Sequence, residues 1–464
     1  MNSVQKCDDS EGDASVTQKA PSIPPLTSRQ MLIFTTVSVC YIAVCMSSVI
    51  IAPFFPTEAD NKGISSVHIG FIFATYNLVN CLTSPLFGKY LPVLGAKFTC
   101  LAGTWVSGGC NLLFGFLPKI SDPSTFLVYC YIIRGIEGAG CAASVTAGMT
   151  IIANTFPHRI AKMNGLYEAA AGLGLMLGPP VGGFLYGLGG YQLPFLVLGS
   201  LNLLFVVIII FVLPPVGVDD TEAGSLMKVL RIPAVHPALL VTLVASMTIS
   251  FLDPTLSIHL QKFNLSPALI GVEFLLIGGM YGIFSPIWGH YADKWRTTRI
   301  MMILGLYSAT LSCLFMGPSP LLKLPSSIWI VNIGIATVGF NLSLALLAAF
   351  ADLYHTAEWF HLESDLALQG VISGVFNFAY WIGSFIGPSS AGVLLDSVGF
   401  EWTSSIFALF NLSVMLVVSF FCLWEYQCGK GRRPPGGTSI LLDAEERKPL
   451  IENGAVSINE HADV

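Results

Sequence analysis

Long apolar stretches alternate with short polar segments along almost the whole chain. Their positions predict helices near residues 31–53, 67–87, 98–118, 126–152, 163–187, 192–213, 238–260, 267–289, 300–317, 326–350, 369–395 and 402–424, with ends defined to within several residues. About 20 apolar residues in a helix cross the roughly 30 Å hydrocarbon layer of a bilayer. The pattern therefore predicts an all-α membrane protein with 12 transmembrane helices, whose surroundings are the lipid bilayer.

The composition agrees with this prediction and excludes other classes. Charged residues make up 11% of the 464 residues, against about 25% in a typical soluble domain. The mean hydropathy is +0.71. The 11 cysteines lie mostly inside apolar stretches without regular spacing, which predicts neither a disulfide framework nor a metal site. No nucleophile–base constellation indicates an enzyme, no cofactor is expected, and the net charge of −6 predicts no nucleic-acid partner.

Basic residues indicate the orientation, because they concentrate in cytosolic loops. If the N-terminus is cytosolic, 17 of the 22 Lys and Arg residues fall in cytosolic segments: Lys6, Lys19, Arg29, Lys89, Lys97, Arg159, Lys162, Lys228, Arg231, Lys294, Arg296, Arg299, Lys430, Arg432, Arg433, Arg447 and Lys448. The bias predicts that both termini are cytosolic.

The polar segment 214–236 divides the chain into two related halves. The predicted organisation is a cytosolic tail (1–30), a six-helix half (31–213), a cytosolic linker (214–236), a second six-helix half (237–425) and a cytosolic tail (426–464). Two constant offsets relate the halves. Adding 201 maps Pro53 onto Pro254, Ser65 onto Ser266, Gly70 onto Gly271 and Ser84-Pro85 onto Ser285-Pro286, and adding 209 maps Gly174, Gly178-Pro179, Gly183 and Gly190 onto Gly383, Gly387-Pro388, Gly392 and Gly399. Duplicated halves with a central substrate site are typical of transporters.

Three glycine-containing motifs carry a resemblance to a known superfamily. They are Gly178-Pro179-Pro180 with Gly183 in the fifth helix, Arg134-Gly135 in the fourth, and Gly289-His290-Tyr291-Ala292-Asp293-Lys294 in the expected loop after the eighth. Glycines allow close helix approach and prolines interrupt the backbone hydrogen bonds. The combination resembles the major facilitator superfamily. The resemblance implies that Asp293 acts as a cytosolic latch between helices, and the alternative is a solvated loop charge.

A closer resemblance is to the vesicular amine transporter family. It rests on Leu252-Asp253-Pro254-Thr255-Leu256, on Asp352-Leu353-Tyr354-His355-Thr356 after the tenth helix, and on Ile386-Gly387-Pro388-Ser389. The sequence departs from the family where Val44 and Asn377 stand at acidic positions. The pattern is most similar to the polyamine-transporting branch, and it implies transport of polyamines or related organic cations in exchange for protons.

Ionisable residues within the spans are the candidate binding groups, because each costs about 2.5–3.5 kcal/mol in hydrocarbon and should face a cavity or a partner. The acids are Glu137, Glu168, Asp253 and Glu273, and the base is Arg134. An excess of acids predicts a cavity that favours cations. Arg134 and Glu137 share a helix face, so a purely structural ion pair is the alternative. Glu168 and Glu273 alternatively lie solvated at an interface.

Asp253 is the strongest candidate for substrate binding and proton coupling, with Glu137 second. Asp253 precedes Pro254, which should distort the backbone, and its equivalent in the first half is Ala52. A carboxylate that binds either a proton or a cation, but not both, provides exchange. Tyr167, Tyr281, Tyr380 and Trp381 could add cation–π contacts, or simply pack.

The C-terminal tail carries a possible sorting signal. Glu446 followed by Leu450-Ile451 fits an acidic dileucine pattern, which predicts binding to clathrin-adaptor machinery and residence in secretory vesicles or lysosome-related organelles. The sequence thus predicts a monomeric vesicular antiporter for polyamines or related cations. A transporter of monoamines or other solutes, and a receptor or scaffold on the same fold, remain alternatives.

Overall fold

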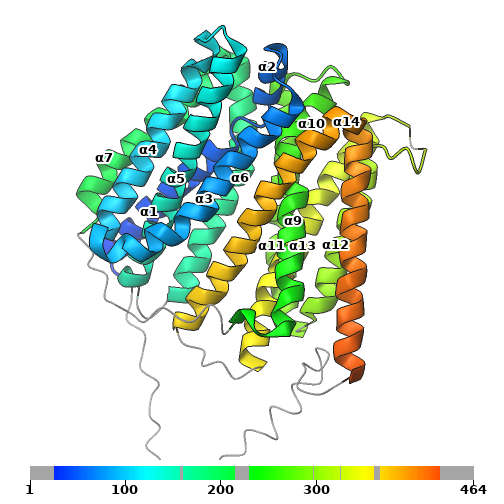
Figure 1. The fold of residues 1–464 in the computed structure, drawn as a ribbon. Helices are drawn as coiled ribbons and strands as arrows, with labels where there is room; N and C mark the ends of the chain where they lie inside the picture. Colours follow the sequence, from blue (N-terminus) through cyan, green and yellow to red (C-terminus); the bar gives the residue numbers. More distant parts are fainter. Residues whose placement is uncertain are drawn as a thin grey trace, which may run out of the picture.

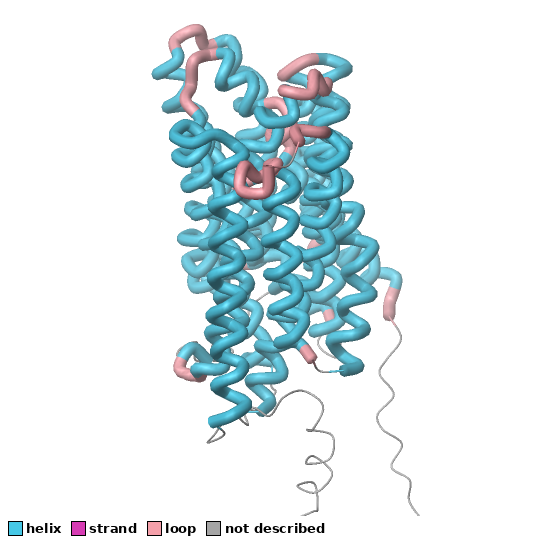
Figure 2. Tube along the Cα trace, turned by 90° about the vertical axis from the view of Figure 1, so that its right-hand side faces the viewer, coloured by secondary structure: helices cyan, strands magenta, loops and turns pink. Residues whose placement is uncertain are grey.

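The computed structural model describes residues 26–156, 160–214, 229–295, 297–323, 325–359 and 366–428. These residues form long helices and contain no strand, and Figure 2 shows the helices running side by side with loops gathered at the two ends. The first half contains α1 (Ser28–Val49), α2 (Phe55–Asn61), α3 (Ser66–Leu94), α4 (Ala96–Phe116), α5 (Pro123–Thr155), α6 (Ile160–Gly189) and α7 (Gln192–Val212). The second contains α9 (His236–Ser250), α10 (Leu252–Gln261), α11 (Pro267–Trp295), α12 (Thr298–Met316), α13 (Ile328–Trp359) and α14 (Leu366–Cys428).

The helices account for 12 crossings of the bundle. Eleven stretches among the described residues are long and apolar enough to span a membrane. The longest, Val371–Glu425, is interrupted at Gly399, whose φ of 78° is not helical. Figure 1 shows α14 ascending on one side of this interruption and descending on the other. The all-α fold with 12 transmembrane helices is therefore confirmed.

Two expected loops are helical instead. The motif that begins at Gly289 belongs to the last turns of α11, which continues to Trp295, and the motif that begins at Asp352 belongs to α13, which continues to Trp359. Hydropathy marks where a helix leaves the lipid, but a helix continues into water as long as its backbone hydrogen bonds are made. The predictions of loops at these two motifs were therefore wrong.

The two offsets found in the sequence reappear in backbone conformation. Ile50 is the C-cap residue of α1, and Phe251, 201 positions later, is the C-cap residue of α9. The first crossing of each half is therefore interrupted at the same place. Gly63 (φ 79°) and Asn264 (φ 55°) follow with the same offset. Gly190 (φ 69°) and Gly399 (φ 78°) are 209 positions apart. Each half thus repeats one chain path at these positions, including two of its positive-φ turns.

The halves touch at one end of the bundle, which we call the closed end. It is the end at which α2 and α10 lie, opposite to the end at which α1 begins and α14 finishes (Figure 1). There, a methyl group added at Gly70 would lie 2.3 Å from the Pro388 carbonyl oxygen, and one added at Gly183 would lie 2.4 Å from that of Pro267. Glycine is required at both places because backbones of opposite halves are in contact.

At the opposite end, which we call the open end, three described glycines make no such contact. A methyl group added at Gly165 of α6, Gly289 of α11 or Gly374 of α14 would meet no atom within 4 Å. These three helices meet the other half near the closed end and separate from it toward the open end. Among the described residues, the two halves are therefore in closer contact at the closed end than at the open end.

Candidate functional site

Arg134 and Glu137 form a buried ion pair on α5. The Arg134 Nη1 atom lies 2.9 Å from Glu137 Oε2, and both side chains are nearly inaccessible. Arg134 Nη2 donates to the Ser48 carbonyl oxygen at 2.8 Å, and Asn111 donates to Glu137 Oε1 at 3.0 Å. The Tyr76 ring centre lies 4.6 Å from the guanidinium carbon. In this conformation the charge of Glu137 is neutralised inside the first half.

Asp253 lies at the break between α9 and α10. Phe251 separates the two helices, and Asp253 occupies the first turn of α10, directly before Pro254. A negative charge is favoured there by the unpaired N–H groups of a helix N-terminus. Its side chain is half-buried, and among the described residues it forms neither an ion pair nor a hydrogen bond. The structure thus confirms the interrupted backbone expected before Pro254.

A base of the other half of the molecule acts on Asp253. Arg134 on α5 attracts its carboxylate electrostatically, although the two do not form an ion pair. Arg134 Nε has no hydrogen-bond partner. Arg134 therefore binds Glu137 directly and attracts Asp253 from across the boundary between the halves.

Glu168 reaches the space between the halves from α6. Its side chain is exposed, although Tyr41 of α1 and Tyr281 of α11 are both close enough to interact with its charge. One turn along α6, a methyl group added at Gly172 would lie 3.9 Å from the Tyr281 ring. Among the described residues Glu168 has no ion-pair or hydrogen-bond partner.

Two tyrosines lie between Asp253 and Glu168. Tyr380 of α14 interacts electrostatically with both Asp253 and Tyr281, and Tyr281 interacts with Glu168. Trp381 packs edge-on against Tyr380, with ring centres 5.6 Å apart. Pairwise electrostatic interactions therefore link Asp253, Tyr380, Tyr281 and Glu168 in that order, from the second half to the first. We call this series the acid–tyrosine path.

Glu273 lies outside this path. Its carboxylate faces Asn332 of α13, whose amide nitrogen, oriented toward it, is 3.2 Å away and also contacts the Ile328 carbonyl oxygen. No charged side chain among the described residues acts on Glu273. The structure therefore does not bring Glu273 together with Asp253 and Glu168, and places it in a contact between α11 and α13.

The Gly-Pro motifs lie where helices cross closely. A methyl group added at Gly178 would lie 2.5 Å from Val49 Cγ2, and one added at Gly387 would lie 2.4 Å from Ser250 Oγ. Pro179 and Pro388 lie inside α6 and α14. Both motifs therefore pack against the last turn before the break in the first crossing of their own half. The side chain of Asp293 and residues Glu446, Leu450 and Ile451 lie outside the described part of the structure.

Sequence reasoning missed a second buried charge cluster. Arg299 of α12 forms an ion pair with Glu425 of α14, and its Nε lies 3.5 Å from Asp352 Oδ1. Thr298 donates to the same Asp352 oxygen at 2.7 Å. Arg299 is among the predicted cytosolic bases, and the last predicted span ends at residue 424, just before Glu425. The signal that could have identified them is that each lies next to the end of a predicted span.

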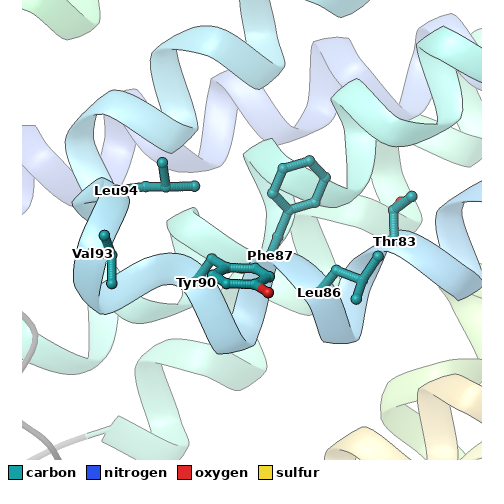
Figure 3. A pocket seen from close by; sticks show the side chains of 6 residues that line it. All are labelled: Thr83, Leu86, Phe87, Tyr90, Val93 and Leu94. Carbon is teal, nitrogen blue, oxygen red and sulfur yellow. The ribbon is translucent and has the colours of Figure 1, made fainter.

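A surface hollow of about 300 Å³ on α3 is separate from these groups (Figure 3). Its lining consists of Thr83, Leu86, Phe87, Tyr90, Val93 and Leu94. It contains no carboxylate, so it offers no ionic site for a cation.

Comparison with known proteins identifies the class. The model of the Major Facilitator Superfamily matches residues 37–388 and 238–460. A bacterial homologue of the human lysosomal transporter Spinster, solved inward-facing and unoccupied, superimposes with a TM-score of 0.62 over 86% of this chain and 96% of that chain, at 12% identity. The chain belongs to the major facilitator superfamily, and is a membrane transporter rather than an enzyme.

Relatives within the superfamily confirm the second resemblance. The human MFS-type transporter SLC18B1 is 36% identical over 430 residues, which cover 92% of this chain and 93% of that protein. The mouse SLC18B1 is 34% identical, with 92% and 94% covered. The bovine synaptic vesicular amine transporter is 28% identical over 77% of this chain and 66% of its own length.

The Arg134–Glu137 pair should stabilise the first half mainly because each side chain neutralises a buried charge that would otherwise have no partner. Arg134→Met should lower the thermal unfolding midpoint in detergent clearly, because breaking a buried pair costs about 3–5 kcal/mol. Adding Glu137→Gln should restore most of the loss, since no unpaired carboxylate remains. Lys89→Met, at an exposed base, is the control and should have little effect. A double variant no more stable than Arg134→Met would contradict this account.

Proposed function

We propose that this transporter exchanges protons for polyamines or related organic cations and loads these cations into acidic intracellular vesicles. The observation that carries the proposal is the acid–tyrosine path. Its two carboxylates, Asp253 and Glu168, form no ion pair among the described residues, whereas Arg134 is already bound by Glu137. The names of the relatives, which include a synaptic vesicular amine transporter, agree with this substrate class and compartment.

The charge of the path favours a cation with several amines. A carboxylate at each end attracts ammonium groups, and the tyrosine faces between them can hold a cation by cation–π contacts. Asp253 and Glu168 belong to different halves, so an extended ligand can bind both while its middle passes Tyr380 and Tyr281. A ligand with one amine can bind only one of the two carboxylates at a time.

The same carboxylates provide a route to exchange. A protonated carboxyl no longer attracts an ammonium group, so a proton and a cation compete for Asp253. When the site opens to an acidic compartment, protonation releases the cation. When it opens to the cytosol, loss of the proton restores the charge and the next cation binds. The open end described above corresponds in this proposal to the cytosolic face, with both termini on that side.

Asp253 should be essential for this cycle. Asp253→Asn retains the shape of the side chain but removes the charge for which proton and cation compete, so cation uptake into acidified proteoliposomes should fall to background. Dissipating the pH gradient should stop uptake by the unmodified protein in the same way. The amount of folded variant, measured by size-exclusion chromatography, is the control. Uptake by Asp253→Asn within a factor of two of the unmodified protein would remove Asp253 from the site.

Glu168 should determine the preference for long cations. In the unmodified protein, inhibition constants should improve from a monoamine through a diamine to a tetra-amine. Glu168→Gln should weaken the tetra-amine about tenfold, because it removes a contact to a charged group worth about 1.5–3 kcal/mol, and should change the monoamine little. Glu273→Gln is the matched control, because Glu273 lies outside the path. Equal affinity along the series in the unmodified protein would indicate a single-carboxylate site instead.

The tail should direct the protein to the vesicles. The proposal places the pattern Glu446 to Ile451 in the cytosol, where an adaptor can bind it. Replacing Leu450 and Ile451 with alanine should raise the surface-biotinylated fraction several-fold, with transport in proteoliposomes unchanged. An unaltered surface fraction would show that the pattern does not act as a sorting signal.

A further inference from the structure

The N-terminus of α3 receives its cap from the opposite half of the molecule. The first N–H groups of a helix lack partners within the helix and are usually bound by the side chain of the residue just before it. Ser65 occupies that place before α3, but its side chain makes no capping hydrogen bond. Instead, Asp396 of α14 accepts from the Ser66 nitrogen through Oδ1 and from the Val67 nitrogen through Oδ2, both at 3.3 Å.

The equivalent helix in the second half is capped differently. Ser266, 201 positions after Ser65, precedes α11, and its hydroxyl accepts from the Leu269 nitrogen at 3.4 Å. The position equivalent to Asp396, 209 residues earlier, is Gly187, which has no side chain with which to reach α11. Ser266 therefore caps α11, and no described acidic side chain of the first half takes its place. Ser65 has the same position and the same hydroxyl group before α3, but the N–H groups at the start of α3 are bound by Asp396.

The cap lies in the seal of the closed end. Gly70 and Gly392 bring the backbones of α3 and α14 into contact within one to two turns of Asp396, and a methyl group added at Gly392 would lie 2.4 Å from the Ser66 carbonyl oxygen. Among the described residues, the other hydrogen bonds between the halves are neutral: Asn77, farther along α3, donates to the Ser384 carbonyl oxygen at 2.7 Å, and Gln261 donates to Thr57. The carboxylate of Asp396 is thus a charged group bound directly to the other half across the seal.

We propose that Asp396 is a latch that holds the closed end shut by capping α3, and that Ser65 takes over the cap when the closed end opens. The exchange works because the N–H groups of Ser66 and Val67 can be bound in either state. In the closed arrangement the ionised carboxylate binds them and gains from the positive end of the helix dipole. In the open arrangement the local hydroxyl binds them less strongly. The difference between the two caps favours the closed arrangement, and the cap from Ser65 limits the loss on opening.

The test follows the separation of the halves directly and requires no substrate. Distance labels are attached through non-canonical amino acids at Asp60 of α2 and Leu322, after α12, both exposed, so that the native cysteines stay unmodified. The distance distribution is measured by pulsed electron spin resonance on the full chain in lipid nanodiscs. Asp396→Ala should raise the fraction with a separated closed end about fivefold, as expected for loss of a typical helix cap. Asp396→Asn, which retains an acceptor oxygen without the charge, should give a smaller increase.

Two further variants distinguish the latch from a general loss of packing. Ser65→Ala should lower the separated fraction, because it removes the cap available to α3 only after separation. Ser266→Ala is the matched control: its helix is capped locally in both states, so the distribution should not change. An Asp396→Ala distribution identical to that of the unmodified protein would overturn the proposal, and so would an increase in the separated fraction in Ser65→Ala. Loss of cation uptake in any variant bears on the proposed function and leaves this measurement unaffected.

Discussion

The cost of an unpaired charge in a low-dielectric interior explains how this bundle is arranged. A lone carboxylate or guanidinium is unfavourable there by several kcal/mol, so each ionised group must have a partner or reach water. Arg134 and Glu137 meet the requirement with one another and with Asn111 and the Ser48 carbonyl. Glu168 meets it by being exposed, and Asp253 by being only half-buried. Solvent exposure and ion pairing are two solutions to the same constraint.

The two halves share a set of neutral hydrogen bonds between helices, and the charged groups differ between them. In the first half Asn202 donates to Ser47 Oγ at 3.0 Å. In the second half Asn411 donates to Thr248 Oγ1 at 2.9 Å. Asn411 is the equivalent of Asn202 by the offset of 209, and Thr248 is the equivalent of Ser47 by the offset of 201. Asn111 donates to Glu137 on α5, whereas Asn341 on α13 donates to Ser312, the equivalent of Asn111. The contact between the third and fourth crossings is charged in one half and neutral in the other. The repeat thus conserves the polar contacts, while the two halves differ in charge.

The sequence predicts the crossings well because hydrocarbon thickness fixes the length of an apolar stretch, and it predicts the paired halves because glycine and proline mark the same turns twice. It does not predict where α11 and α13 end, since a helix can continue beyond the lipid. The individual acids are visible in the sequence, but which of them meet depends on packing between helices. Glu168 acts on Tyr281 and Asp253 acts on Tyr380, and the two tyrosines act on one another, whereas Glu273 contacts Asn332 instead. The sequence does not predict the cluster of Arg299, Asp352 and Glu425, because each of these residues lies near the end of a different span.

The glycine contacts of the closed end also affect the thermodynamics of opening. Gly70, Gly183, Gly271 and Gly392 bring main chain against main chain, so closure immobilises few side-chain torsions. An interface built from long side chains would lose about 0.5–1.5 kcal/mol for each rotamer-rich group it fixes, and that loss grows with temperature. The four glycine contacts avoid this loss where main chain meets main chain. They should therefore add little to the temperature dependence of separating the halves at this end.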